Sequence, residues 1–214
     1  MDKTIEKTMK NLEKNNMQPF FVESAKDVVP LVKTLIHPGE SVANGGSETL
    51  LQTGVMELLD SGDYRFIDRR KATPDTIRDC YVQAFGCDSY FCSSNAITEN
   101  GELYNVDGNS NRVACIVYGP KQVIIVAGRN KIVPDLDAAI ERVKTVAAPL
   151  NTKRLHCATY CEKENKCVSL LNEAPQLCEG CTSDGRICCN YVVSARQRHK
   201  NRIKVILVNE NLGY

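Results

Sequence analysis

The sequence predicts a mixed α/β fold, a three-layer arrangement in which helices cover a sheet of mainly parallel strands. Two observations support this prediction. Short β-branched segments alternate with amphipathic helical segments over residues 1–148, which is typical of a parallel sheet with helices on its faces. Over residues 151–190 the periodicity fails and cysteine becomes frequent, before a last β-branched strand at 203–208. A cysteine-rich insertion in an α/β domain accounts for this order.

The first half of the chain is expected to alternate helices and strands. An N-terminal amphipathic helix should end before Pro19, because proline cannot continue a helix, and Asp27 and Pro74 are typical of helix starts. The expected elements are a helix at 5–16, a strand at 20–22, a helix at 27–36, a strand at 41–43, a helix at 48–59, a strand at 64–67 and a helix at 73–84.

The second half is expected to add a hairpin, two central strands and a long helix. The hairpin turn is predicted at Asn100-Gly101, and segments rich in valine and isoleucine indicate the central strands. The expected elements are a strand at 90–92, hairpin strands at 96–98 and 102–106, central strands at 113–118 and 122–127, a helix at 134–148 and the last strand at 203–208. We expect residues 1–214 to form a single domain, with a cysteine-rich metal-binding segment at 151–190 within it.

Composition excludes several classes of protein. The formal net charge of +1 gives no overall field that would attract nucleic acid, and the basic stretch 196–204 has no interleaved aromatic residues to stack bases. No apolar run approaches the roughly 18 residues of a membrane span, and the N-terminus does not resemble a secretory signal. We therefore expect a cytoplasmic protein. In a reducing compartment, eleven cysteines favour metal or thiol chemistry over disulfides.

The late cysteines are the most specific signal in the chain. They are Cys157, Cys161, Cys167, Cys178, Cys181, Cys188 and Cys189. Thiolates suit iron–sulfur clusters or zinc, and the pair Cys178-Glu-Gly-Cys181 can place two sulfurs on one metal centre. The spacing matches neither a ferredoxin nor a standard zinc finger, so iron–sulfur, zinc and metal-free thiols all stay open. The four earlier cysteines, Cys80, Cys87, Cys92 and Cys115, are expected in the core.

Two polar segments could bind a small anion. Gly45, Gly46 and Ser47 lie between a strand and a helix, where glycines let a ligand approach the backbone, although an ordinary capped turn explains them equally. The second segment supplies Ser94, Asn95, Asp107 and Arg112, with the Arg112 fork as an anion ligand; loop-forming turn chemistry is the alternative. We expect both segments at the carboxyl edge of the sheet, facing one cleft. The motif Asp68-Arg69-Arg70, just after a strand, could add charge to the same edge, but a surface turn is the expected structure.

Several of these segments together resemble the lactate-utilisation (LUD) domain family. The resembling segments are Val42-Ala43-Asn44-Gly45-Gly46-Ser47-Glu48-Thr49-Leu50, residues 93–103 (SSNAITENGEL), Asn105-Val106-Asp107-Gly108-Asn109, Asn111-Arg112-Val113, Tyr118-Gly119-Pro120-Lys121, residues 127–133 and residues 202–214. The resemblance implies the three-layer α/β fold of coenzyme A transferases and sugar-phosphate isomerases, whose members bind anions at strand ends. The best-known members are subunits of an iron–sulfur complex that oxidises L-lactate, although fold alone does not decide function.

The resemblance extends to the cysteines. Thr159-Tyr160-Cys161, Asn165-Lys166-Cys167, Cys181 and Gly185-Arg186-Ile187-Cys188 look like the cysteine series of single-domain members, with an insertion that makes Cys167 and Cys178 competitors for one role. It implies metal ligands among Cys161, Cys167, Cys178, Cys181 and Cys188, with an iron–sulfur cluster, [4Fe–4S] favoured, as the cofactor and zinc as the alternative. The ferredoxin-type repeats of the electron-carrying lactate subunit are missing.

These inferences combine into one expected function with one alternative. The first is an iron–sulfur LUD-domain protein that acts on a small carboxylate or phosphate metabolite, as a lyase or hydrolase-type enzyme or as a subunit of a lactate-oxidation complex. The alternative is a zinc-stabilised, non-catalytic or regulatory partner of a redox complex. A small anionic metabolite is the expected ligand, nucleic acid and membrane are not expected, and a homodimer or a redox-complex partner stays open.

Overall fold

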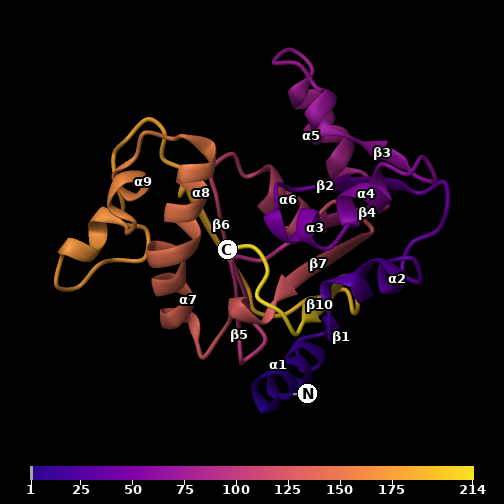
Figure 1. Ribbon diagram of the computed structural model, residues 1–214, viewed down its shortest axis with the longest axis horizontal. Helices are drawn as coiled ribbons and strands as arrows, with labels where there is room; N and C mark the ends of the chain where they lie inside the picture. The colour runs from indigo at the N-terminus through magenta and orange to yellow at the C-terminus, as the bar shows by residue number, and fades with distance from the viewer. Residues whose placement is uncertain (1) are drawn as a thin grey trace.

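A six-stranded parallel sheet forms the centre of the molecule (Figure 1). The structure is a computed structural model and describes residues 2–214. In spatial order the strands are β1 (Gln18–Val22), β10 (Ile203–Val208), β7 (Gln122–Gly128), β4 (Ser89–Cys92), β2 (Ser41–Asn44) and β3 (Arg65–Ile67). All neighbouring pairs are parallel, as predicted, so every strand of this sheet ends at the same edge.

Helices cover both faces of this sheet and give the predicted three layers. Along β7, Val123 and Ile125 contribute to one hydrophobic core while Ile124 and Val126 contribute to the other, because successive side chains of a strand point to opposite faces. The first core is closed by α1 (Lys3–Lys14), α5 (Ile77–Phe85) and α6 (Asn111–Val117), and the second by α2 (Val28–Val32), α3 (Glu48–Gln52) and α4 (Val55–Leu59). Cys87, Cys92 and Cys115 are buried in the first core as expected, whereas Cys80 is only half-buried.

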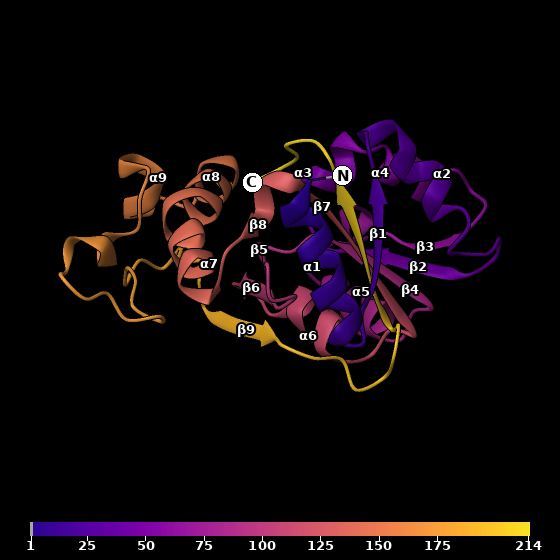
Figure 2. The ribbon, with the colours of Figure 1, turned by 90° about the horizontal axis from the view of Figure 1, so that it is seen from below.

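A second, smaller sheet lies beside the first (Figure 2). Its order is β8 (Ile132–Val133), β5 (Ala96–Thr98), β6 (Leu103–Asp107) and β9 (Asn190–Ser194). The pairs β5–β6 and β6–β9 are antiparallel, so the predicted hairpin is present. Because β9 pairs with β6, the chain that leaves the cysteine segment is returned to this sheet before it reaches β10.

A helical arm carries the cysteine segment away from the main sheet (Figure 1). It consists of α7 (Leu136–Arg142), a π-helical stretch at Val143–Ala147 and α8 (Ala148–Leu155), followed by α9 (Tyr160–Glu164). The helix was expected to end at residue 148, yet it continues past Pro149 to Leu155. The wider turn directly before Pro149 accommodates a residue that has no N–H to donate. The extension places the end of α8 close to the main sheet.

The prediction of a central strand at 113–118 is wrong, because this segment forms α6. The Asp107 carboxylate accepts hydrogen bonds from the backbone N–H groups of Asn109, Ser110 and Val113, which satisfies donors at the start of the helix. Val113 and Ile116 are buried three positions apart, which places them on one face of a helix. A central strand that is buried on both faces would be equally rich in apolar residues. Composition alone could not separate the two.

Other differences concern helix boundaries. The helix expected at 48–59 is two helices, α3 and α4, because Gly54 adopts a left-handed conformation with φ of 72° between them. The helix expected at 73–84 begins later, at Ile77, because Thr73 and Thr76 form a hydrogen-bonded turn ahead of it. The helix expected at 27–36 ends as an α-helix at Val32. Strands β8 and β9 were not predicted.

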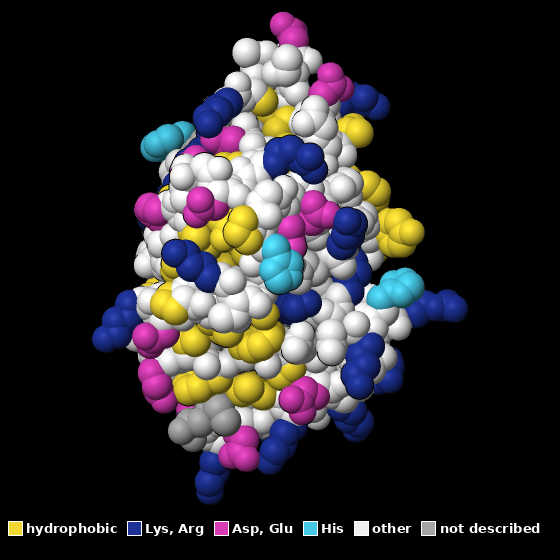
Figure 3. Space-filling model, turned by 90° about the vertical axis from the view of Figure 1, so that its right-hand side faces the viewer, with side chains coloured by type: hydrophobic (Ala, Val, Ile, Leu, Met, Phe, Trp, Pro, Cys, Tyr) yellow, Lys and Arg dark blue, Asp and Glu magenta, His cyan; other side chains and the backbone are white. Residues whose placement is uncertain are grey.

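The surface at the main-sheet end mixes both signs of charge. Figure 3 shows Lys and Arg side chains interspersed with Asp, Glu and hydrophobic side chains on this face. Within residues 2–214, no helix combines the length and the apolar character needed to cross a membrane.

Candidate functional site

Four of the late cysteines line one cavity at the base of the helical arm. Cys161 lies on α9, Cys167 precedes a short 3₁₀ turn, and Cys181 and Cys188 lie in the loop that leads to β9. The cavity has a volume of about 30 Å³. Much of the remaining lining is apolar, including Ile140, Val143 and Ala148 from α7, the π-helical stretch and α8. The fold therefore brings together four of the five cysteines that were expected to bind metal.

Hydroxyl groups contact two of these sulfurs. Cys161 Sγ lies 3.3 Å from Thr159 Oγ1 and 3.5 Å from Thr152 Oγ1. Ser169 Oγ donates to Cys167 Sγ at 3.3 Å, and Ser169 in turn accepts a hydrogen bond of 2.9 Å from the buried Lys144 ammonium. Hydrogen bonds of this kind stabilise a thiolate and tune the potential of a thiolate-bound centre.

Arg186 organises the loop that carries the other cysteines. Its guanidinium donates to the backbone carbonyls of Cys178, Cys181 and Cys188 at 2.8, 3.0 and 2.8 Å. It also donates to the Tyr191 hydroxyl at 3.2 Å. A single rigid fork thus fixes three cysteine-bearing stretches of backbone. Sequence reasoning identified the cysteines but not this residue as the group that orders them.

Burial and the neighbouring thiols disfavour the ionised form of Cys188. Burial raises the pKa of the Cys188 thiol to about 12, and the neighbouring Cys161 and Cys167 thiols add to the increase. An ionised Cys188 therefore needs a positive charge inside the cavity. In residues 2–214, no three His, Cys, Asp or Glu side chains are close enough to share one metal ion. The thiols surround the cavity without converging on a single point.

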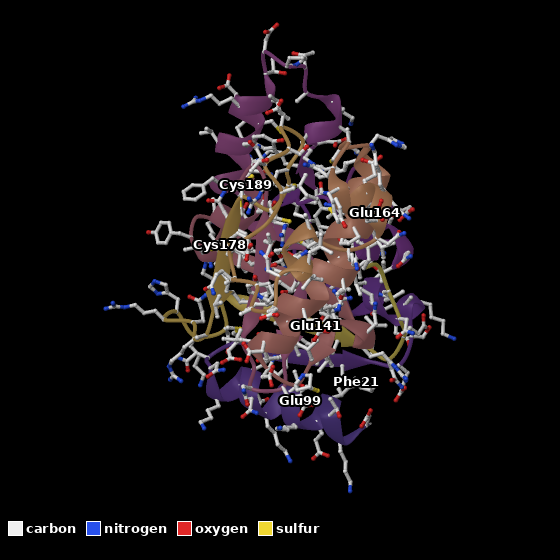
Figure 4. The ribbon with its side chains drawn as sticks, turned by 90° about the vertical axis from the view of Figure 1, so that its left-hand side faces the viewer. Phe21, Glu99, Glu141, Glu164, Cys178 and Cys189 are labelled. Atoms are coloured by element: carbon white, nitrogen blue, oxygen red, sulfur yellow. The ribbon has the colours of Figure 1, made fainter. Side chains whose placement is uncertain are left out.

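The remaining late cysteines lie outside the cavity. Cys178 and Cys189 are exposed, and Figure 4 shows both toward one edge of the cysteine segment. Cys157 is half-buried and lies against Gly185, where an added Cβ would come within 1.9 Å of the Cys157 carbonyl oxygen. Of the two competitors for one role, Cys167 is the one that faces the cavity, and Cys178 contributes only its carbonyl to Arg186.

The polar residues expected to bind an anion surround a second, larger cleft of about 310 Å³. Its lining includes Gly46, Ser47, Ser94, Asn95, Asp107 and Arg112. Gly45 lies beneath it, where an added Cβ would stand 3.0 Å from both Arg112 Cδ and the Tyr90 hydroxyl. The two segments therefore meet at one cleft, at the carboxyl edge of the parallel sheet, as predicted.

Within the cleft, several of these side chains are engaged by the protein itself. Arg112 Nη1 donates to Ser93 O and Asn105 Oδ1, and Nη2 donates to Asn95 Oδ1 and Val106 O, at 2.6 to 3.2 Å. The Arg112 Nε atom lies 3.6 Å from an Asp107 carboxylate oxygen. A bidentate contact between Arg112 and an anion would have to replace some of these bonds. Ser47 caps α3, and its Oγ accepts from the backbone N–H of Leu50 at 3.4 Å.

Two other cations in the cleft carry charge that no carboxylate offsets. The cleft also contains Arg154, but its Nε lies 3.4 Å from Glu48. Arg69 and Lys131 line the cleft and form no ion pair within the described residues 2–214. An added Cβ on Gly46 would stand 2.6 Å from Arg69 Nη2, so Arg69 lies directly over the glycine turn. The excess positive charge favours an anionic ligand.

Sequence reasoning missed Lys131 and gave Arg69 a place at this edge only as the less favoured alternative. The motif at 68–70 was expected to be a surface turn, which holds for Arg70, whose guanidinium pairs with Asp60 and Asp68. Arg69 instead reaches the cleft. Lys131 follows the end of β7 by three positions, as Ser94 and Asn95 closely follow the end of β4. That position at a strand end was the available signal.

The two cavities adjoin. Cys188 and Ile187 line both, as do Val143 and Ala148 from the arm. An added Cβ on Gly108, which also lines the cleft, would stand 3.2 Å from Ile187 Cα, so the cysteine loop packs closely against the cleft wall. The expectation that the cysteine segment lies beside the polar cleft is met in this arrangement.

Fold and site together define a three-layer α/β protein with a ligand-sized cleft at the carboxyl edge of its parallel sheet and a cysteine-lined cavity next to that cleft. The family model of the LUD domain matches residues 5–208, and the chain belongs to this family.

One solved structure supports the fold. A DUF162 family protein from Deinococcus radiodurans is similar over 96% of both chains, with 14% identity and a TM-score of 0.51. Two subunits from Chaetomium thermophilum match more weakly: eIF2B beta (16% identity, TM-score 0.37, covering 52% of this chain and 43% of that one) and eIF2B delta (14%, 0.36, 51% and 48%). No curated protein matches this chain.

Proposed function

We propose that this LUD-domain protein is a cytoplasmic iron–sulfur protein that also binds a small carboxylate or phosphate metabolite, as an enzyme or an enzyme subunit. Cys161, Cys167, Cys181 and Cys188 would hold a [4Fe–4S] cluster, and the adjoining cleft would hold the metabolite. One observation carries the proposal: a four-cysteine cavity shares a wall, which includes Cys188, with a cleft that has an excess of positive charge.

The donor set supports a cluster. Four thiolates are the usual ligands of a [4Fe–4S] cluster, and each binds a different iron. A single tetrahedral zinc ion, the alternative, would need every sulfur about 2.3 Å from one point. A bound cluster would supply redox or Lewis-acid chemistry beside the cleft.

The chain's own residues would position such a group. Arg186 fixes the backbone of the Cys181 and Cys188 loop, the Thr159 hydroxyl contacts Cys161 Sγ, and the Ser169 hydroxyl donates to Cys167 Sγ. The present cavity, about 30 Å³, has room for about two water molecules. Seating a cluster therefore requires the largely exposed segment at 171–182 to move outward.

The size and charge of the cleft support a small anion. Its volume of about 310 Å³ is at the lower end of ordinary ligand pockets, which run from about 300 to 1,000 Å³. Arg69 supplies positive charge that no carboxylate offsets within residues 2–214, and Lys131 adds to it in its protonated form, while the carboxylates of Glu48 and Asp107 are paired with arginines. Small carboxylates of the lactate type and inorganic phosphate are the first ligands to test.

Anaerobic purification followed by iron, sulfide and zinc quantification tests the cofactor. We expect a brown protein with about four irons per chain, and loss of most of that iron in each of C161S, C167S, C181S and C188S. C178S and C189S serve as matched controls, because both cysteines lie outside the cavity, and they should retain iron. A colourless protein with one zinc per chain would overturn the cluster, as would full iron retention in the four cavity variants.

Calorimetry tests the cleft separately. Titration of the purified protein with phosphate, L-lactate or pyruvate should show saturable binding that weakens at least tenfold in R69M. The matched control is R70M, since Arg70 is next in the chain but pairs with Asp60 and Asp68 away from the cleft. Absence of binding by all three compounds would overturn the metabolite part of the proposal.

A further inference from the structure

Lys131 is the lysine among the described residues that line the cleft, and its amine is enclosed and lacks a carboxylate partner within residues 2–214. It lies in the 3₁₀ turn Arg129–Lys131 that follows β7, with only 3% of its surface exposed. The residue lines the cleft, which is therefore the route by which a small molecule can reach the amine. Burying an unpaired ammonium is costly, so such a position favours the neutral amine.

Two hydroxyls hold the amine in place. Lys131 Nζ donates to Ser93 Oγ at 2.9 Å and to Thr49 Oγ1 at 3.1 Å. Each hydroxyl directs its own proton to a backbone carbonyl, Ser94 O at 3.5 Å and Leu212 O at 3.4 Å, so both hydroxyls act as acceptors toward the lysine. A neutral amine has two N–H groups. Both N–H groups donate to these acceptors, so the lone pair of the nitrogen is left without a hydrogen-bond partner.

The surroundings also disfavour the charged form. Burial is the largest cause that lowers the pKa of Lys131, to about 7, and the guanidinium groups of Arg142 and Arg112 add to it. Arg142 is buried and donates to the Asn95 carbonyl at 2.6 Å. Near neutral pH, a substantial fraction of the molecules therefore carries an uncharged, oriented amine at the cleft.

We propose that Lys131 is a nucleophile that forms an imine with the carbonyl group of a small oxo acid bound in the cleft. The proposal rests on the metabolite part of the proposed function and names the substrate class, a carbonyl compound that also carries a carboxylate. The excess positive charge beside Gly46, from Arg69, would hold that carboxylate.

The step is balanced without an oxidant. The nitrogen lone pair attacks the carbonyl carbon and forms a C–N bond, while one nitrogen proton moves to the carbonyl oxygen and gives a carbinolamine. The C–O bond then breaks, and the oxygen leaves as water with the second nitrogen proton. One amine and one carbonyl group thus yield one imine and one water.

Reductive trapping on the full-length protein, purified anaerobically, tests the proposal. The protein is incubated with glyoxylate or pyruvate and cyanoborohydride, which reduces an imine to a stable secondary amine, and the modified lysines are mapped by peptide mass spectrometry. We expect Lys131 to be labelled at least tenfold faster than Lys153, an exposed lysine of α8 in the same molecule. L-lactate has the carboxylate but no ketone or aldehyde group that could form an imine, so it should compete for the cleft and slow labelling at Lys131 only.

Variants and binding data separate the possible outcomes. T49V removes one hydroxyl acceptor and should slow labelling of Lys131, and R69M should slow it by weakening carboxylate binding. Labelling of Lys131 no faster than Lys153 would overturn the imine, whether or not calorimetry shows that pyruvate binds. If pyruvate binds and Lys131 is unlabelled, the cleft keeps its proposed function and Lys131 acts only as a charge. If nothing binds, both proposals fail.

Discussion

Replacing Lys131 with methionine should change the way in which stability depends on pH. Burial lowers the pKa of Lys131 from its ordinary value of 10.5 to about 7 in the folded protein. Between these two values the unfolded chain holds a proton that the folded chain has lost, so the free energy of unfolding rises with pH through this window. Below about pH 7 both states are protonated, and the cost of burying the charge is constant and largest.

The size of the effect follows from the shift. A full one-proton difference changes the free energy of unfolding by about 1.4 kcal/mol per pH unit. Because the folded protein is only half deprotonated at pH 7, the wild type should gain on the order of 2 kcal/mol from this residue between pH 7 and pH 9. K131M fills a similar volume without a titrating group. The free energy of unfolding of K131M relative to the wild type should therefore be most favourable at pH 7. This difference should be about 2 kcal/mol smaller at pH 9.

The groups around Lys131 do not obscure this difference. Arginine side chains are not deprotonated in proteins, and burial raises the pKa of Cys92 to about 12, so this neighbouring thiol does not titrate between pH 7 and pH 9. Groups distant from residue 131 contribute equally to both proteins and cancel in the comparison. The pH dependence of the difference can be assigned to Lys131.

Urea denaturation followed by circular dichroism at pH 7, 8 and 9 measures the effect. K153M, which replaces an exposed lysine of α8, is the matched control and should differ from the wild type by a constant amount at all three pH values. If K131M also differs by a constant amount, Lys131 stays charged in the folded protein and the reasoning from burial is refuted. A changed slope of the urea dependence would instead indicate a change in the surface exposed on unfolding.

Three further substitutions test other contacts. R186M removes the donors to three cysteine carbonyls, so the iron bound per chain should fall at least twofold on metal quantification; unchanged iron would show that the loop is ordered without this residue. G46A places a Cβ 2.6 Å from Arg69 Nη2 and should displace that flexible side chain. Phosphate binding should then weaken about tenfold in calorimetry, while the urea midpoint stays nearly constant. Equal affinity would mean that Arg69 does not contact the anion. R202M removes hydrogen bonds to the carbonyls of Cys115, Ile116 and Pro120 and should lower the free energy of unfolding by about 2 to 3 kcal/mol in urea titrations; a loss below about 0.5 kcal/mol would mean that water replaces these bonds.

The parallel sheet could be predicted because its strands have a simple pattern. Strands β7 and β10 are continuous β-branched runs, and their neighbours lie between amphipathic helices. The segment 113–118 is also rich in apolar residues, but the strand predicted there was wrong. Its helix begins at the Asp107 carboxylate and packs through one face, and neither feature can be recognised from the composition of the segment. Propensity is outweighed here by a cap and by tertiary contacts.

The candidate site could be predicted in part for a related reason. Glycine and cysteine have special backbone and ligand chemistry that can be recognised from the residue type alone, so Gly46, Cys161 and Cys188 were identified from the sequence. Arg69 and Lys131 are ordinary surface residues by type, and only the convergence of neighbouring strand ends makes them part of the cleft. Whether such a residue has a carboxylate partner depends on residues that are distant in the sequence, so it cannot be predicted from a local pattern.

The wall shared by the two cavities links their occupancies. Cys188 and Ile187 face both spaces, so a group that moves the cysteine loop also reshapes the cleft. If an occupant of the cysteine cavity changes the affinity of the cleft for its ligand by some factor, thermodynamic linkage requires that the ligand changes the affinity of the cavity for its occupant by the same factor. A metabolite that binds more tightly to the metal-loaded chain would raise the equilibrium affinity for the metal by that same factor, so competition with a chelator at equilibrium becomes a reporter for ligands of the cleft.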